Sequence, residues 1–171
     1  MSPPKTPGRV RTAYRTVPGW LSPTALGLCL VGLAVSVYLT YDHFSGGGTL
    51  ACPEGETVNC AKVTESQWSS VFGVPVAPLG LVFFLVLLPL CRPAAFRRPG
   101  LALDRLRLAW VGVGLAMVFY LVWAELFKIQ AICLWCTVVH VVTFLLLVVL
   151  MFGQILIRPA PTRLRYKDRP R

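Results

Sequence analysis

The chain has 171 residues, of which 56% are hydrophobic and only 14% are charged, and its formal net charge is +10. This length suffices for one domain. The mean hydropathy of +0.66 is too high for a soluble protein of this length. The basic residues lie beside long apolar segments, so they indicate a membrane surface rather than nucleic acid as the partner.

Four apolar segments are long enough, or nearly so, to cross roughly 30 Å of hydrocarbon, which takes about 20 helical residues. In chain order they cover about residues 20–41, 71–90, 108–124 and 131–157. We therefore predict an all-α integral membrane protein with a four-helix transmembrane bundle and one large outer loop. The bundle domain spans residues 19–157, between tails at 1–18 and 158–171.

The distribution of Lys and Arg predicts the orientation of these helices. Fifteen of the seventeen basic residues lie in the two tails and in the segment between the second and third helices, whereas the opposite side holds Lys62 and Lys128. Cytoplasmic loops accumulate Lys and Arg, so we predict a multi-pass plasma-membrane protein with both termini cytoplasmic. The basic tails are expected to rest on anionic membrane lipid. The first apolar segment is too long for a cleaved signal peptide.

Four of the six cysteines then fall on the outer, oxidising side of the membrane. Cys52 and Cys60 lie in the first outer loop, and Cys133 and Cys136 form a C-x-x-C at the outer start of the fourth helix. Unsatisfied N–H groups in a first helical turn stabilise a thiolate, which is the nucleophile in disulfide exchange. An exposed, mobile loop dithiol beside such a pair indicates an electron relay through mixed disulfides.

Other interpretations of the cysteines stay open at this point. The four outer cysteines could form two structural disulfides, or a Cys₄ zinc site. Seven residues separate Cys52 from Cys60, which fits zinc spacing poorly, and we expect no metal. Cys29 is predicted to be a packing residue, and Cys91 a reduced cytoplasmic thiol.

A relay in a membrane needs an electron acceptor, and we expect a quinone dissolved in the bilayer. Thr137 follows Cys136, so the sequence has no haem-attachment motif, and no nucleotide-binding fingerprint stands out. His140 shares a helical face with both C-x-x-C cysteines and is predicted to hydrogen-bond a quinone carbonyl or relay its proton. The alternative is a neutral packing histidine. Trp135 is a candidate wall of the quinone pocket, although it could equally be an interfacial aromatic.

Taken together, these motifs resemble the vitamin K epoxide reductase (VKOR) family, in the bacterial branch that lacks a fused thioredoxin-like domain. The resemblance rests on the loop pair, on Ser66 six residues after Cys60, and on the C-x-x-C sequence of the last helix. It also includes Phe72-Gly73-Val74-Pro75, which is expected to open the second helix.

The resemblance implies a four-helix bundle around a quinone and gives each cysteine a role. Cys52 would face a thioredoxin-fold partner, Cys60 would attack Cys133, and Cys136 would face the quinone. Ser66 matches a serine near the quinone ring. In bacterial relatives the electrons come from a secreted, DsbA-like protein that makes disulfides in exported proteins; here that partner is expected to act in trans.

Two departures from animal members disfavour vitamin K epoxide as the substrate. Asn59 is the only asparagine, so none stands at the start of the second helix, and His140 replaces a tyrosine. A DsbB-type oxidase is the nearest analogue, but its two cysteine pairs occur in the reverse order. We therefore predict a thiol–disulfide oxidoreductase that reduces menaquinone or ubiquinone. The alternatives are an animal-type vitamin K reductase and a disulfide-stapled, non-enzymatic scaffold.

Overall fold

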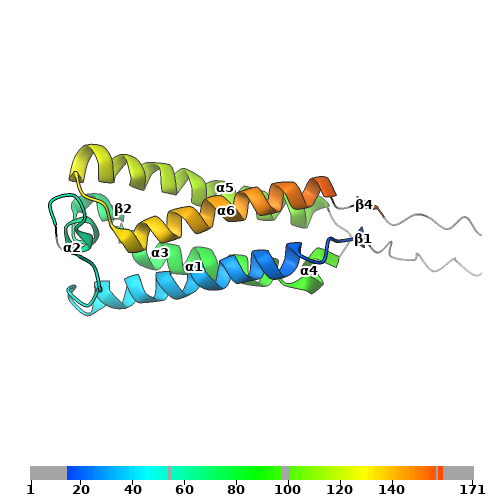
Figure 1. Cartoon of the computed structure of the whole chain (residues 1–171), viewed down its shortest axis with the longest axis horizontal. Helices are drawn as coiled ribbons and strands as arrows, with labels where there is room; N and C mark the ends of the chain where they lie inside the picture. The colour runs from blue at the N-terminus through cyan, green and yellow to red at the C-terminus, as the bar shows by residue number, and fades with distance from the viewer. Residues whose placement is uncertain (1–14, 54, 98–100, 157, 160–171) are drawn as a thin grey trace, which may run out of the picture.

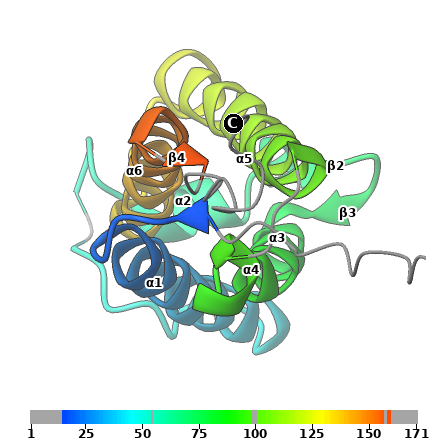
Figure 2. The ribbon, with the colours of Figure 1, turned by 90° about the vertical axis from the view of Figure 1, so that its right-hand side faces the viewer.

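The computed structural model describes residues 15–53, 55–97, 101–156 and 158–159. Four helices run side by side along the long axis of the molecule (Figure 1). They are α1 (Leu21–Phe44), α3 (Val76–Leu90), α5 (Leu101–Ala124) and α6 (Leu134–Leu156). Helix α1 packs against α3 and α6, and α5 packs against α6, so the four helices enclose a common interior (Figure 2).

The outer surface of this bundle is apolar, as expected for contact with lipid. Three helical stretches are long and apolar enough to cross a membrane: Leu21–Phe44, Ala102–Ile129 and Leu134–Leu156. The fourth, α3, has 15 residues and spans only about 22 Å at 1.5 Å per residue. Large side chains such as Val113, Phe119 and Phe144 are more than half exposed, which is unfavourable in water but costs nothing in hydrocarbon. The fold is that of a membrane helical bundle.

Short elements close the two ends of the bundle (Figure 1). One end carries α2 (Cys60–Thr64), a 3₁₀ turn η1 (Gln67–Ser69) and the hairpin of β2 (Ser70–Val71) and β3 (Val74–Pro75). The opposite end carries α4 (Pro93–Arg97) and an antiparallel pair of β1 (Arg15–Thr16) with β4 (Arg158–Pro159). Pairing of β1 with β4 holds the start of α1 and the end of α6 at the same end.

The second helix begins five residues later than the sequence indicated. Phe72-Gly73-Val74-Pro75 forms the hairpin rather than the first turn of the helix, because Phe72 and Gly73 both have positive φ, 51° and 78°. Two such residues make the tight turn that joins antiparallel strands. Pro75 then precedes α3 as its N-cap, where its missing N–H is not needed.

The third and fourth helices also differ from their predicted bounds. Helix α5 begins at Leu101 rather than 108, and a π-helical turn η2 (Glu125–Ile129) extends it beyond 124. Helix α6 begins at Leu134 rather than 131, because Ile132 instead forms a bridge with Val58 of the outer loop.

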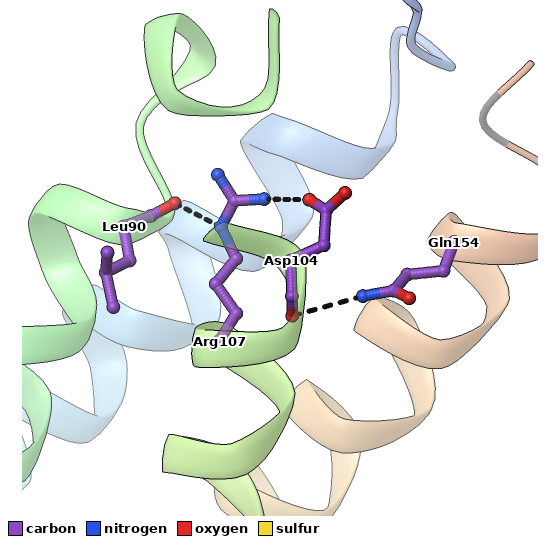
Figure 3. A network of polar contacts seen from close by, with 4 residues as sticks. All are labelled: Leu90, Asp104, Arg107 and Gln154. Carbon is purple, nitrogen blue, oxygen red and sulfur yellow. Dashed lines mark hydrogen bonds and ion pairs between the residues drawn. The ribbon is translucent and has the colours of Figure 1, made fainter. Parts of the chain in front are cut away.

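The early start of α5 brings Arg107, expected in a basic loop, into the bundle interior. Its Nε donates to the Leu90 carbonyl at 2.6 Å, and its guanidinium pairs with Asp104 at 2.8 Å (Figure 3). The guanidinium also lies 4.0 Å from the centre of the Phe96 ring. The Gln154 amide donates to the Asp104 carbonyl at 3.2 Å, so this network links α3, α4, α5 and α6.

One apolar cluster packs α1, α3, α5 and α6 against one another. Cys29 and Cys91 are both fully buried in it, and their thiols hydrogen-bond to each other. Cys29 therefore packs as expected, whereas Cys91, expected as a cytoplasmic thiol, is inside the protein. Helices α1 and α3 approach so closely at Gly32 that an added Cβ would overlap the ring of Phe84.

Candidate redox site

The outer loop is joined to the segment before α6 by backbone hydrogen bonds. The N–H of Ile132 donates to the Thr57 carbonyl at 2.9 Å, and the N–H of Asn59 donates to the Ile132 carbonyl at 3.1 Å. The Asn59 side chain then caps α2 by accepting from the Lys62 N–H at 2.9 Å. Because α2 begins at the next residue, these bonds place Cys60 in the same buried cluster as Cys133.

The two loop cysteines form a disulfide, Cys52–Cys60, with their Cα atoms 6.1 Å apart. Cys60 is 2% exposed, unlike the exposed loop cysteine expected from the sequence. Ala51, the residue before Cys52, makes two hydrogen bonds to the bundle. Its N–H donates to the Tyr38 hydroxyl at 2.9 Å, and its carbonyl accepts the Trp135 indole N–H at 3.1 Å. The loop is thus packed and tethered at its cysteines.

The C-x-x-C pair is not disulfide-bonded and has an asymmetric environment. Cys133 is fully buried immediately before α6, and its Sγ accepts the Cys136 N–H at 3.2 Å. The Cys136 thiol and the N–H groups of Cys136 and Trp135 lower the pKa of Cys133, against the opposing effects of burial and of the Glu125 charge. The hydrogen bonds and the open N-terminus of the helix thus favour a thiolate on Cys133, whereas its burial and the Glu125 charge favour the thiol.

An apolar cavity of about 290 Å³ lies on the other side of Cys136. Its walls come from α1, α3, α5 and α6, with a few polar groups that include His140, Ser36 and Ser69. Small-molecule sites typically have volumes of roughly 300–1,000 Å³ and this mixture of apolar walls and a few polar groups. The cavity therefore fits a small, flat, largely apolar molecule such as a quinone ring.

The structure brings some predicted quinone-site residues to this cavity but not others. Cys136 and His140 line it, one helical turn apart on α6. Ser66 is not among the lining residues, and its hydroxyl donates to the Val63 carbonyl at 2.9 Å. Trp135 likewise faces the loop, where it meets Tyr38 edge-on at 5.0 Å. Ser69, three residues beyond Ser66, takes the cavity position instead.

Several polar residues of the cavity were not singled out from the sequence. They are Ser36 and His43 on α1, Thr64 and Ser69 in the outer loop, and Thr143 on α6. Thr143 had a usable signal, because it lies three residues after His140 and so shares its face. The loop residues Thr64 and Ser69 carried none, because their place at the cavity depends on contacts between the loop and the bundle. Among the described residues, no group of three His, Cys, Asp or Glu side chains could hold a metal ion.

A bundle of apolar helices with a disulfide-bonded loop pair beside a helix-borne C-x-x-C defines a membrane protein of the thiol–disulfide oxidoreductase class. Comparison with known families specifies it further. The model of the vitamin K epoxide reductase family matches residues 23–151, and the chain belongs to this family. Its members act on quinone-type substrates. No protein of curated function matches the chain significantly.

Proposed function

We propose that this protein oxidises the dithiol of a secreted, DsbA-like thioredoxin-fold partner and transfers the electrons to a bilayer quinone. One observation carries the proposal: Cys133 packs with Cys60 of the loop disulfide, while Cys136 lines the apolar cavity. The two cysteine pairs thus form a continuous path from the outer loop to a space suited to a quinone ring.

Electrons enter through the loop disulfide. A partner thiolate attacks Cys52 and releases Cys60, and the second partner thiolate resolves the mixed disulfide, which leaves the partner oxidised and the loop reduced. The Cys60 thiolate then attacks Cys133 of a Cys133–Cys136 disulfide and releases Cys136. Cys52 attacks Cys60 in turn, which re-forms the loop disulfide and releases Cys133.

The C-x-x-C dithiol is reoxidised at the cavity, where the quinone accepts two electrons and two protons. Cys136 lies at the cavity wall and supplies the reacting sulfur. His140, one helical turn further along α6, is positioned to hydrogen-bond a ring carbonyl or to relay a proton. The quinone is menaquinone or ubiquinone.

The charge distribution supports an orientation for this reaction. With fifteen of the seventeen basic residues assigned to the cytoplasm, α1, α3, α5 and α6 all cross the plasma membrane, and both termini are cytoplasmic. The cysteine loop then faces the extracytoplasmic side, where the exported partner acts. Asn59, the only asparagine, caps α2, so no asparagine is left for an epoxide-reducing role of the animal type.

The decisive experiment is quinone reduction by the purified full-length protein in lipid nanodiscs, with a reduced thioredoxin-fold protein as electron donor. Wild type should reduce the quinone, and Cys133→Ala and Cys136→Ala should each abolish the reaction. The matched control, Cys29→Ala, removes a buried thiol outside the path and should retain turnover within about twofold. Turnover in both single variants with a small dithiol would contradict the mechanism.

The same assay separates a relay loop from a structural one. Cys52→Ala should block the protein donor but retain activity with a small, membrane-permeant dithiol, which can reach the C-x-x-C pair directly. Equal loss with both donors would assign the loop disulfide to structure. A disulfide-stapled scaffold would show no quinone reduction with either donor.

A further inference from the structure

A buried carboxyl group lies beside the C-x-x-C pair and has no role in the steps described above. Glu125 is only 5% exposed, although it directly follows the last residue of α5. Its surroundings are mostly apolar: the cluster at this end contains Cys60, Val63, Ala124, Ile129, Ala131 and Cys133. Burying a carboxyl group in such a place is unfavourable unless it interacts with a specific partner.

The backbone around Glu125 is fixed by an unusual turn. The helix widens into the π-helical turn η2, and the Glu125 carbonyl accepts both the Gln130 N–H and, at 3.2 Å, the Ala131 N–H. Gln130 adopts a left-handed conformation with φ of 52°, which is rare for a residue other than glycine or asparagine. Single π-helical turns often occur at functional sites. This turn brings the chain back past Glu125 as it enters the C-x-x-C motif.

The partner of the Glu125 side chain is the C-x-x-C motif itself. Its carboxylate accepts a hydrogen bond from the backbone N–H of Cys133, and its charge acts on the sulfur atoms of both Cys133 and Cys136. Lys128, on the same turn, instead lies over the rings of Trp68 at 5.5 Å and Trp123 at 5.3 Å. Cys60 of α2 is held in the loop disulfide. The titrating groups that face Glu125 are thus the two C-x-x-C thiols.

We propose that Glu125 exchanges a proton with the sulfur of Cys133 each time the loop and the C-x-x-C pair exchange disulfides. The need arises from burial: Cys133 has no exposed surface, so water cannot readily protonate its sulfur when it is released as a leaving group. The inference rests on the proposed function, because it assigns a proton donor to one of its steps.

The step balances as follows. The Cys52 thiolate attacks Cys60 of a Cys60–Cys133 mixed disulfide, so that the Cys52–Cys60 bond forms and the Cys60–Cys133 bond breaks with its electron pair on Cys133. The Glu125 carboxyl group gives its proton to that sulfur and becomes a carboxylate. When Cys133 returns to a disulfide with Cys136, its proton goes back to Glu125, which is thereby regenerated. The two protons that the quinone takes up are matched by the two that the loop thiols lose to water when Cys60 and Cys52 become attacking thiolates.

The first test measures the ionisation of Cys133 without turnover. In full-length protein carrying Cys52→Ser, Cys60→Ser and Cys136→Ala, the rate of Cys133 alkylation by iodoacetamide is followed against pH by mass spectrometry. Adding Glu125→Gln keeps an oxygen that accepts the Cys133 N–H but removes the charge and the proton. A negative charge disfavours a nearby thiolate. Removing it with Glu125→Gln should therefore move the midpoint of the alkylation rate against pH lower by about one pH unit, relative to the parent. The exposed-loop control Glu56→Gln should not move it. A Glu125→Gln profile that superimposes on that of the parent would overturn the proposal.

The second test measures the exchange step itself. After rapid reduction of the loop by the reduced thioredoxin-fold donor, in protein whose C-x-x-C pair is oxidised, Glu125→Gln should slow re-formation of the loop disulfide at least about tenfold, as expected for loss of a general acid. Glu125→Asp keeps an acid and should recover part of the rate, whereas a residue needed only for packing would show no such rescue. An unchanged rate in Glu125→Gln would also overturn the proposal. If wild type shows no loop exchange, the proposed function fails, but the alkylation profile still decides whether Glu125 and Cys133 share a proton.

Discussion

At the scale of single residues, the side chains of α6 contact two different parts of the site, which are the outer loop and the cavity. Trp135 bonds to the loop, Cys136 forms part of the cavity wall, and His140 lies deeper along the same cavity. The division follows from helical geometry, because residues four apart share a face whereas neighbours do not. Substitutions on this helix should therefore separate loop function from quinone function.

His140→Phe should raise the KM for quinone or slow its reduction, because it removes the ring nitrogens at the cavity wall while keeping an aromatic side chain. His140→Tyr restores a hydrogen-bond donor and should retain more activity than His140→Phe. The matched control is Val141→Phe, which adds an aromatic ring on the exposed side of α6. Quinone kinetics in nanodiscs would measure the effect; identical KM values for the His140 variants and wild type would make His140 a packing residue.

Trp135→Phe should affect the loop rather than the quinone. The change removes the indole N–H that holds the Ala51 carbonyl beside Cys52, so the loop disulfide should be reduced faster by a small dithiol. The quinone KM should stay within about twofold of wild type, because Trp135 does not line the cavity. A large rise in quinone KM with unchanged loop reduction would support the pocket role first predicted for Trp135.

At the scale of whole elements, close helix contacts and a buried polar network hold the bundle together. Helices in lipid gain no hydrophobic free energy from associating, so small residues that allow close packing, and hydrogen bonds between helices, stabilise the fold. Gly32 on α1 provides the first kind of contact, and the network around Arg107 provides the second.

Gly32→Ala should destabilise the bundle by about 1–3 kcal/mol, because its methyl group would overlap the Phe84 ring and force α1 and α3 apart. Gly27→Ala is the matched control on the same helix, since no atom lies within 4 Å of the added Cβ. That variant should be neutral or slightly more stable, as alanine favours helix more than glycine by about 1 kcal/mol. Thermal unfolding in detergent distinguishes them; equal midpoints would contradict the close contact.

Asp104→Ala should destabilise the bundle by about 3–5 kcal/mol, the range for breaking a buried ion pair. Asp104 and Arg107 are 5% and 1% exposed, and they connect α5 to both α3 and α6 (Figure 3). Arg105→Ala, which removes an exposed arginine one residue away, should change stability by less than about 0.5 kcal/mol. Equal losses in the free energy of unfolding for Asp104→Ala and Arg105→Ala would show that the buried network contributes no more stability than the exposed arginine does.

At the scale of the whole molecule, the bundle has two chemically different ends. The cysteine loop, α2 and the hairpin lie at one end, whereas α4 and the paired strands β1 and β4 lie at the other (Figure 1). The proposed orientation assigns the first end to the outside.

Lys62→Cys and Arg97→Cys test that orientation, because both side chains are exposed and lie at opposite ends. In intact spheroplasts, a membrane-impermeant maleimide should label Lys62→Cys but label Arg97→Cys only after permeabilisation. Labelling is read by mass spectrometry against the unsubstituted protein, so that native thiols are accounted for. The reverse pattern would invert the topology and contradict extracytoplasmic disulfide exchange.

The sequence by itself determined the class of fold and the two cysteine pairs of the site. Runs of about 20 apolar residues have few stable structures other than membrane helices, and cysteine spacing is a local property that needs no fold to be recognised. Helix ends were less predictable. The Phe72-Gly73 turn, the π-helical turn at Glu125 and the bridge at Ile132 each depend on contacts between segments distant in the chain.

Only the tertiary structure decided which residues share a site. Ser66 was the serine expected beside the quinone, whereas the packing of η1 on the bundle places Ser69 at the cavity instead. Nothing in the sequence indicated that Arg107 and Glu125 are buried; Asp104 pairs with the first, and the Cys133 N–H bonds to the second. Burial of a charged group depends on partners that folding brings together, which is why one-dimensional patterns of charge and hydropathy did not reveal it.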